Sequence, residues 1–220
     1  MNEKLRLRFQ KTGRAVYISH LDLMHTMQRA FNRAGYALKY SEGFNPHPQI
    51  AIALPLSVGT GSLCEIMDFK LRDEADLAGL PARLSAVMPE GIRVIEAYAF
   101  TRKVAELKWL RIEGVFEYDT RDPAETAAEL TDFYRQEQIL VRRKTKRGEG
   151  ETDLRAGIRE IRFTPGDHAV NITTILSAQE PTVNPELLAE ALRQRRPELA
   201  PDFAKFTRVE TYDAEMKLYR

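Results

Sequence analysis

Polar and apolar residues alternate at the start of the chain, in residues 4–9. This period of two predicts a strand with one buried face. After a short loop at residues 11–13 the period changes to that of a helix. Ser19 stands where a capping residue is expected, Asp22 follows three positions later as in a capping box, and Gly35 ends the segment. The apolar residues on one face of this helix are Leu21, Met24, Met27, Phe31 and Ala34.

The rest of the first half continues the series of elements. The pattern predicts strands at 37–40, 49–56, 65–71 and 92–100, and a second helix at 76–87. The order is strand, helix, strand, strand, helix, strand, with one additional strand near residue 68. This order is that of a ferredoxin-like domain, in which helices cover one face of an antiparallel sheet.

The second half repeats the same order. It predicts strands at 110–118, 139–144, 158–164, 169–176 and 203–212, and helices at 123–134 and 184–193. We therefore expect an α+β protein built of tandem ferredoxin-like (βαββαβ) domains, with antiparallel sheets and helices packed on one face. The expected domains are residues 1–103 and 104–220, each of about 100 residues.

Composition narrows the classes of function. The 220 residues include 33 Lys and Arg against 32 Asp and Glu, a formal net charge of +1. There is no bulk attraction to nucleic acid or to anionic lipid, so a site for a polyanion must be a local patch. No apolar stretch has the length of a membrane helix, and the first residues lack the apolar core of a signal peptide. We expect a cytoplasmic protein that has no membrane partner.

Cofactor motifs are absent from the sequence. Cys64 is the only cysteine, so one chain can form neither a disulfide nor a cysteine cluster for zinc or iron–sulfur. The nucleotide-binding glycine loops, the Gly-x-Ser-x-Gly elbow, the His-Glu-x-x-His helix and the aromatic submotif of an RNA-recognition sheet are also missing. We expect no cofactor and no metal in this chain.

Two segments, residues 17–22 and 41–48, hold the densest group of unusual residues. If the fold brings them together, His20, Glu42 and His47 converge. A helix N-terminus favours anions, and basic residues on the preceding loop would add to a phosphate site. The simpler interpretation is that His20 is an ordinary first-turn residue and that prolines stiffen the loop. The binding candidates are Lys11, Arg14, Tyr17, Ser19, Asp22, Ser41, Glu42, Gly43, Phe44 and Asn45.

A basic cluster, RRKTKR, occupies residues 142–147. Arg142, Arg143 and Lys144 are candidates for phosphate contacts. Asp153 is expected to tie down the following loop, and Arg155 to pair with a carboxylate or a phosphate. The alternative is a solvated hairpin tip of mixed charge, because acidic residues follow at once.

Three motifs together carry a resemblance to a known family: YISHLDLM at residues 17–24, YSEGFNPHP at 40–48 and TDLR at 152–155. The chain resembles, over essentially its whole length, the radical SAM-linked protein family, a bacterial domain of unknown function found beside or fused behind a radical SAM protein. The family's gene context implies a task in RNA or ribosome metabolism. The resemblance also implies that the iron–sulfur cluster and SAM belong to a partner. The first half is similar to the RAMP superfamily of CRISPR repeat endoribonucleases, although their C-terminal glycine-rich loop is not evident here.

Three functions follow from these observations. The leading hypothesis is an accessory protein of a radical SAM enzyme that binds RNA or a ribonucleoprotein, with that enzyme and RNA or ribosomal components as partners. The enzyme alternative is a metal-independent RAMP-like endoribonuclease with His20 and His47 as general acid and base. The third is a protein-docking scaffold that ignores nucleic acid.

Overall fold

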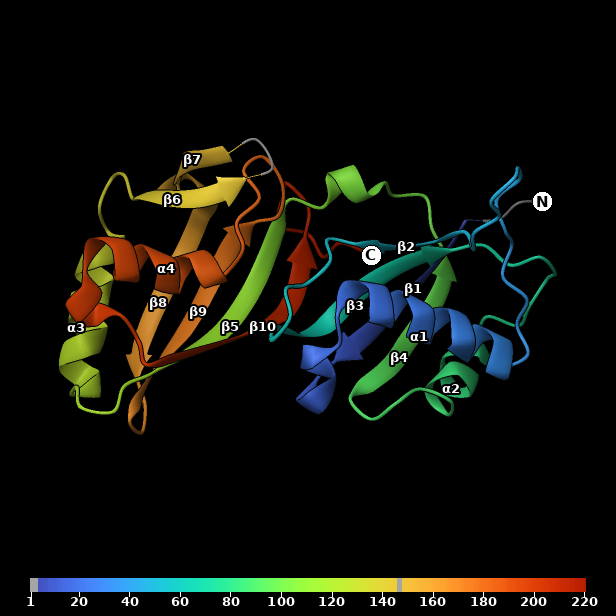
Figure 1. Ribbon diagram of the computed structural model, residues 1–220, viewed down its shortest axis with the longest axis horizontal. Helices are drawn as coiled ribbons and strands as arrows, with labels where there is room; N and C mark the ends of the chain where they lie inside the picture. Colours follow the sequence, from blue (N-terminus) through green and yellow to red (C-terminus); the bar gives the residue numbers. More distant parts are fainter. Residues whose placement is uncertain (1–3, 146–147) are drawn as a thin grey trace. The chain divides into compact units, whose positions relative to one another are not determined.

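A computed structural model describes residues 4–145 and 148–220, with the backbone alone for residues 143–145 and 149 (Figure 1). The chain divides into two compact units. Unit 1 runs to Val104 and includes Arg220, and unit 2 is Ala105–Tyr219. In the described residues, no helix combines the length and the hydropathy that crossing a membrane requires.

Unit 1 is a sheet with two α-helices. Its elements are β1 (Leu5–Lys11), the 3-10 turn η1 (Gly13–Tyr17), α1 (His20–Arg33), β2 (Ile50–Ala53), β3 (Gly61–Phe69), α2 (Leu80–Ser85) and β4 (Ile92–Ala99). The 3-10 turn η2 (Val104–Glu106) follows. The strands lie in the order β4-β1-β3-β2, and each neighbouring pair is antiparallel.

The alternation of β1 positions the core of unit 1. Leu5, Leu7 and Phe9 are buried, and α1 covers them with an apolar face that includes Met27 and Phe31. The N-cap residue of α1 is the one that the sequence predicts. Ser19 Oγ accepts a hydrogen bond from the Asp22 backbone N–H (3.2 Å) and donates to Asp22 Oδ2 (2.7 Å).

Unit 2 has the same strand order with a hairpin added. Its elements are β5 (Trp109–Glu117), α3 (Pro123–Tyr134), β6 (Leu140–Thr145), β7 (Gly148–Asp153), η3 (Arg155–Gly157), β8 (Ile158–Pro165), β9 (Ala169–Ser177), α4 (Glu186–Arg195), η4 (Pro197–Leu199) and β10 (Phe203–Tyr212). The order is β10-β5-β9-β8, again antiparallel throughout, and β6 pairs with β7 in a separate two-stranded sheet.

The expected α+β class is confirmed, and the differences from the predicted elements have local causes. Segment 37–40 forms isolated bridges rather than a strand. The second strand ends at Ala53, because Leu54 has a positive φ of 50° and Pro55 follows. The second helix begins only at Leu80, because the Asp76 carboxylate accepts from the N–H groups of Ala78 and Gly79 and forms a turn there.

Candidate nucleic-acid interface

The start of α1 is exposed, but its basic residues are not all available to a ligand. His20 and Arg14 are exposed, and Tyr17 is 68% exposed. Lys11 is buried, and its Nζ donates to the carbonyls of Val16 (3.1 Å) and Ile18 (3.0 Å). Burial lowers the pKa of Lys11, and the nearby Glu65 carboxylate opposes part of that shift. The assignment of Lys11 to a phosphate site is therefore wrong, since its ammonium group holds η1 in place.

The loop at residues 41–48 is closed by its own hydrogen bonds. The Ser41 N–H donates to the His47 carbonyl (2.8 Å), and the His47 N–H donates to Ser41 Oγ (3.1 Å). His47 Nδ1 lies 2.9 Å from the same Oγ, so the ring is oriented by Ser41. Gly43 has a φ of 118°, which favours glycine. Glu42, Phe44 and Asn45 are exposed at the tip, and the Phe44 side chain is fully so.

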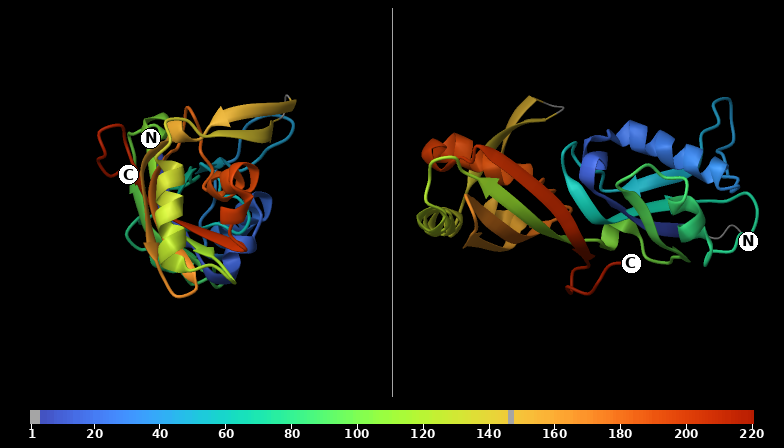
Figure 2. Two further views of the ribbon diagram at one scale, coloured as in Figure 1. Left: turned by 90° about the vertical axis from the view of Figure 1, so that its left-hand side faces the viewer. Right: turned by 90° about the horizontal axis from the view of Figure 1, so that it is seen from below.

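His20 and His47 lie at opposite ends of the sheet of unit 1. β1 begins at Leu5, which pairs with Phe69, and ends at Lys11, which pairs with Ser62. His20 follows the Lys11 end, whereas the loop that holds His47 is attached next to Phe69, where the Lys70 N–H donates to the Gln49 carbonyl (3.1 Å). Figures 1 and 2 show α1 between these two places. The condition for a joint site of His20, Glu42 and His47, that the fold brings the two segments together, is therefore not met.

The basic cluster lies on the β6–β7 hairpin. Arg142 is exposed, and its Nε lies 3.5 Å from Glu151 Oε1. The side chains of Arg143 and Lys144, and residues 146 and 147 altogether, lie outside the described part of the chain. The main chain of Arg142 is bonded to the amide of Gln194 on α4, which fixes the hairpin against that helix.

Asp153 ties down the following loop, in the role that the sequence predicts for it. Its Oδ1 accepts from the N–H groups of Ile139 (3.1 Å) and Arg155 (3.0 Å). The guanidinium of Arg155 donates to the Ile158 carbonyl (2.6 Å) rather than to a carboxylate. This part of the site is therefore held by backbone contacts.

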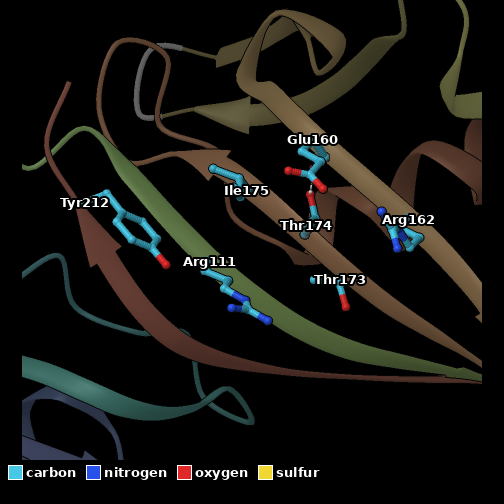
Figure 3. Close-up of a pocket in the computed structure, with 7 residues that line it drawn as sticks. All are labelled: Arg111, Glu160, Arg162, Thr173, Thr174, Ile175 and Tyr212. Carbon is cyan, nitrogen blue, oxygen red and sulfur yellow. Dashed lines mark hydrogen bonds between the residues drawn. The ribbon is translucent and has the colours of Figure 1, made fainter. Parts of the chain in front are cut away.

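The sheet of unit 2 presents basic and aromatic side chains that no motif in the sequence indicates. On β5, Leu110 and Ile112 are buried against the core, so the side chains of Trp109 and Arg111 project from the opposite face of the sheet. Tyr212 is paired with Trp109 across the strands, and Arg162 is paired with Thr173. A hollow of about 380 Å³ lies on this sheet (Figure 3). It is lined by Arg111, Glu160, Arg162, Thr173, Thr174, Ile175 and Tyr212.

Arginines dominate the charge of this surface. Arg111 and Glu113 are only 3.6 Å apart with both side chains about half exposed, and such pairs contribute little. The Arg159 guanidinium lies over the Trp109 ring, 5.3 Å from its centroid. Within the described residues, the side chain of Arg162 has no hydrogen-bond or ion-pair partner. We call Trp109, Arg111, Arg159, Arg162 and Tyr212 the arginine face.

A second hollow, of about 570 Å³, lies along the edge of β8, the last strand in the order β10-β5-β9-β8. Arg135, Arg155, Arg159 and Arg162 all line it, together with residues of α3. Glu160 is the one carboxylate among the described residues that line either hollow. The two hollows share Glu160 and Arg162, and every other charged residue that lines them is an arginine, so arginines outnumber the single carboxylate from the sheet surface to its edge.

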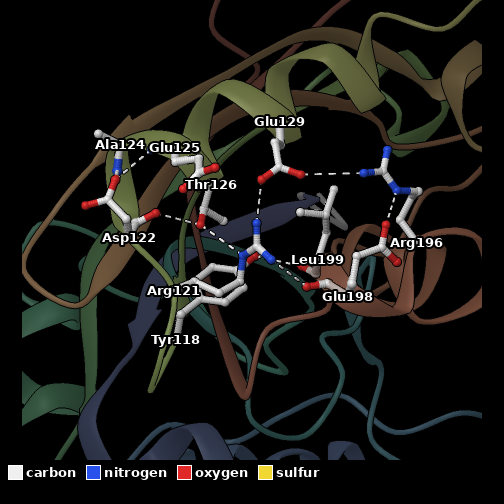
Figure 4. Close-up of polar contacts among 10 residues, drawn as sticks. All are labelled: Tyr118, Arg121, Asp122, Ala124, Glu125, Thr126, Glu129, Arg196, Glu198 and Leu199. Carbon is white, nitrogen blue, oxygen red and sulfur yellow. Dashed lines mark hydrogen bonds and ion pairs between the residues drawn. The ribbon is translucent and has the colours of Figure 1, made fainter.

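Another charged cluster in unit 2 is fully paired (Figure 4). Arg121 donates to Thr126 (3.1 Å), to Glu129 (2.5 Å) and to the Glu198 carbonyl (3.0 Å). Arg196 bridges the carboxylates of Glu129 and Glu198, and this contact lowers the pKa of Glu198. These charges join α3 to η4, so we assign them a structural role.

The described residues contain no group of three or more His, Cys, Asp or Glu side chains placed to hold a metal ion. Cys64 is buried in β3.

No local motif could have revealed the arginine face. Its residues come from segments about 50 to 100 positions apart, and they meet only because the strands pair in this register. The available signal was the alternation in residues 110–118, which places Arg111 on the side opposite to the core.

Comparison with known proteins gives a family but no activity. A family model described as an uncharacterized protein conserved in bacteria (DUF2344) matches residues 4–185. The chain therefore belongs to the DUF2344 family. No curated protein matches the sequence significantly.

Two solved structures are similar to the chain at 8% identity. One is an unknown protein from Galdieria sulphuraria, with 94% of this chain and 96% of that chain covered and a TM-score of 0.28. The other is the acetolactate synthase small subunit from Thermotoga maritima, with 97% and 98% covered and a TM-score of 0.27.

Proposed function

We propose that this chain binds single-stranded RNA on the arginine face of unit 2. The observation that carries the proposal is that arginine and aromatic side chains lie together on one surface of the sheet. Exposed guanidinium groups suit a phosphate backbone, and Trp109 and Tyr212 suit the stacking of unpaired bases. Duplex RNA does not offer unstacked bases to a sheet, so a single strand is the favoured substrate.

The fold supports this proposal. In each unit, strand order and connection match a ferredoxin-like domain, if the β6–β7 hairpin is taken as an insertion between α3 and β8. We propose that the protein is a tandem of two such domains. RNA-recognition domains bind bases on the open face of a similar four-stranded sheet. The arginine face occupies the corresponding surface of unit 2, although its aromatic residues stand at one end of the sheet.

The role of an accessory to a radical SAM enzyme completes the proposal. It rests on the motifs at residues 17–24, 40–48 and 152–155 and on the single cysteine, which leaves the cluster and SAM to a partner. Co-expression of the chain with a radical SAM protein from the same organism tests this role. A complex that elutes as one peak in gel filtration is expected, and separate elution at micromolar concentration would contradict the role without affecting RNA binding.

RNA binding is tested by fluorescence anisotropy with a labelled single-stranded RNA of about 15 nucleotides at low salt. The variant Arg111→Gln/Arg162→Gln is expected to bind at least about 10-fold more weakly than wild type. For wild type, log Kobs falls with log salt, and removal of two phosphate contacts should make that slope shallower by about 1.4.

The matched control is Arg193→Gln/Arg195→Gln. This variant removes the same charge from exposed positions on α4, on the helical side of unit 2. Its affinity should stay within about twofold of wild type. Equal losses in both variants would show that binding follows net charge, and the arginine face would then not be the site.

A further inference from the structure

Unit 1 contains a groove of about 460 Å³ beside β2, the edge strand of its sheet. Such a volume is within the range of small-molecule sites. Its apolar walls are formed by Pro48, Ile50, Ala51, Phe69, Phe100 and Val104. All of the lining residues belong to unit 1, so the groove is a feature separate from the arginine face.

One wall of the groove is held rigid by a buried arginine. The Arg6 guanidinium lies 3.9 Å from the centroid of the Phe100 ring. It donates two hydrogen bonds to the Asp68 carboxylate (2.6 and 3.1 Å) and one to the Arg102 carbonyl (3.2 Å). Asp68 is the one carboxylate among the described lining residues, and Arg6 neutralises it.

The rim of the groove is positively charged. Lys4, Lys70 and Lys103 all line it. Leu5 is paired with Phe69 in the β1–β3 register, so Lys4, which precedes Leu5, and Lys70, which follows Phe69, lie at the same end of these two strands. Neither of these two ammonium groups has a side-chain partner within the described part of the chain.

We propose that this groove binds a small amphiphile with an anionic head and an acyl or aryl body. The head, a carboxylate or a phosphate monoester, lies between Lys4 and Lys70, and the body lies along Ala51 and Phe100. A nucleobase suits the site less well. Two of the lining groups that could bind the edge of a base are already used, since the Gln49 amide donates to the Tyr40 carbonyl (3.2 Å) and Asp68 is bonded to Arg6.

Isothermal titration calorimetry of the full chain tests the proposal with three probes of one chain length: octanoate, octyl phosphate and octanol. At least one of the two anions should bind at least about 10-fold more tightly than octanol, and the tighter one identifies the head group. Octanol binding as tightly as both anions, or the absence of binding by either anion, would overturn the proposal.

Two variants locate the site. Lys4→Gln/Lys70→Gln should weaken binding of the anion by about 10-fold and leave octanol unchanged. Ala51→Trp should abolish binding of every probe, because Ala51 is exposed on β2 and lines the groove. The charge-matched control, Lys108→Gln/Lys205→Gln in unit 2, should bind as wild type does. Unchanged affinity in both groove variants would refute the assignment.

Discussion

Tyr212 lies opposite Trp109 in the antiparallel pairing of β10 with β5. Their side chains therefore leave the same face of the sheet, the face that also carries Arg111. The relationship joins two residues about 100 positions apart, and it places aromatic rings beside guanidinium groups. This juxtaposition is the basis of the proposed RNA site.

Replacing Tyr212 should affect RNA affinity and its salt dependence differently from replacing the arginines. Tyr212→Ala should weaken RNA binding by about 1 to 3 kcal/mol, the usual effect of removing a base–aromatic stack. The salt dependence should not change, because no charge is removed. The measurement is anisotropy at several salt concentrations, with Tyr17→Ala as the control for an exposed tyrosine of unit 1. A changed salt slope with unchanged affinity would contradict the assignment of Tyr212 to stacking.

We expect the folded protein to lose stability at alkaline pH because the hydroxyls of Tyr118 and Tyr134 are buried. The hydroxyl of Tyr118 donates to the Leu199 carbonyl (2.9 Å), and that of Tyr134 to the Leu188 carbonyl (2.5 Å). Burial raises the pKa of both hydroxyls in the folded protein above the ordinary value of 10. Above pH 10 the unfolded chain loses protons that the folded chain keeps, so the stability that these groups contribute below pH 10 falls as pH rises.

Each tyrosine should contribute a slope of about −1.4 kcal/mol per pH unit to the free energy of unfolding, from pH 10 up to its folded pKa. Urea denaturation between pH 9 and 11 measures this slope. The double variant Tyr118→Phe/Tyr134→Phe should have a slope shallower by about 2.7 kcal/mol per pH unit. Identical slopes in the two proteins would show that these hydroxyls titrate normally.

The stability of unit 1 should depend on the ion pair between Arg6 and Asp68. The Arg6 side chain is fully buried, so loss of the carboxylate leaves a buried charge without its main counterion. Asp68→Asn should lower the free energy of unfolding by about 3 kcal/mol, as is usual when one partner of a buried pair is removed. Asp73→Asn is the control, because its pair with Arg72 is exposed on both sides and should change stability by less than about 0.5 kcal/mol. Similar small effects in both variants would show that Arg6 does not depend on Asp68.

The strands and helices that have a clear hydrophobic period or a capping residue could be predicted from the sequence. Leu5, Leu7 and Phe9 are buried along β1 as the alternation predicts, although Arg6 and Lys11 are buried as well, and Ser19 caps α1 with the bond that such a residue makes. Strand β7 was not predicted, because its sequence GEGETD has no apolar alternation and it forms only by pairing with β6. Positions within elements were therefore predictable, while contacts between distant elements were not.

The candidate sites show the same limit. The sequence indicated the turn at residues 41–48 and the role of Asp153, which depend on neighbouring residues. It left open whether His20 lies near His47 and made Lys11 a candidate phosphate ligand, because both questions required knowledge of register and burial. The arginine face was missed for the same reason: Arg162 meets Thr173 only through the β8–β9 pairing.

Ultraviolet cross-linking of a single-stranded RNA to the full chain, with mass spectrometry of the modified peptides, tests the central claim most directly. The account predicts cross-links at Trp109 and Tyr212, reduced by the Arg111→Gln/Arg162→Gln variant and unaffected by Arg193→Gln/Arg195→Gln. Cross-links confined to unit 1, for example at Phe44 or Tyr17, would contradict it.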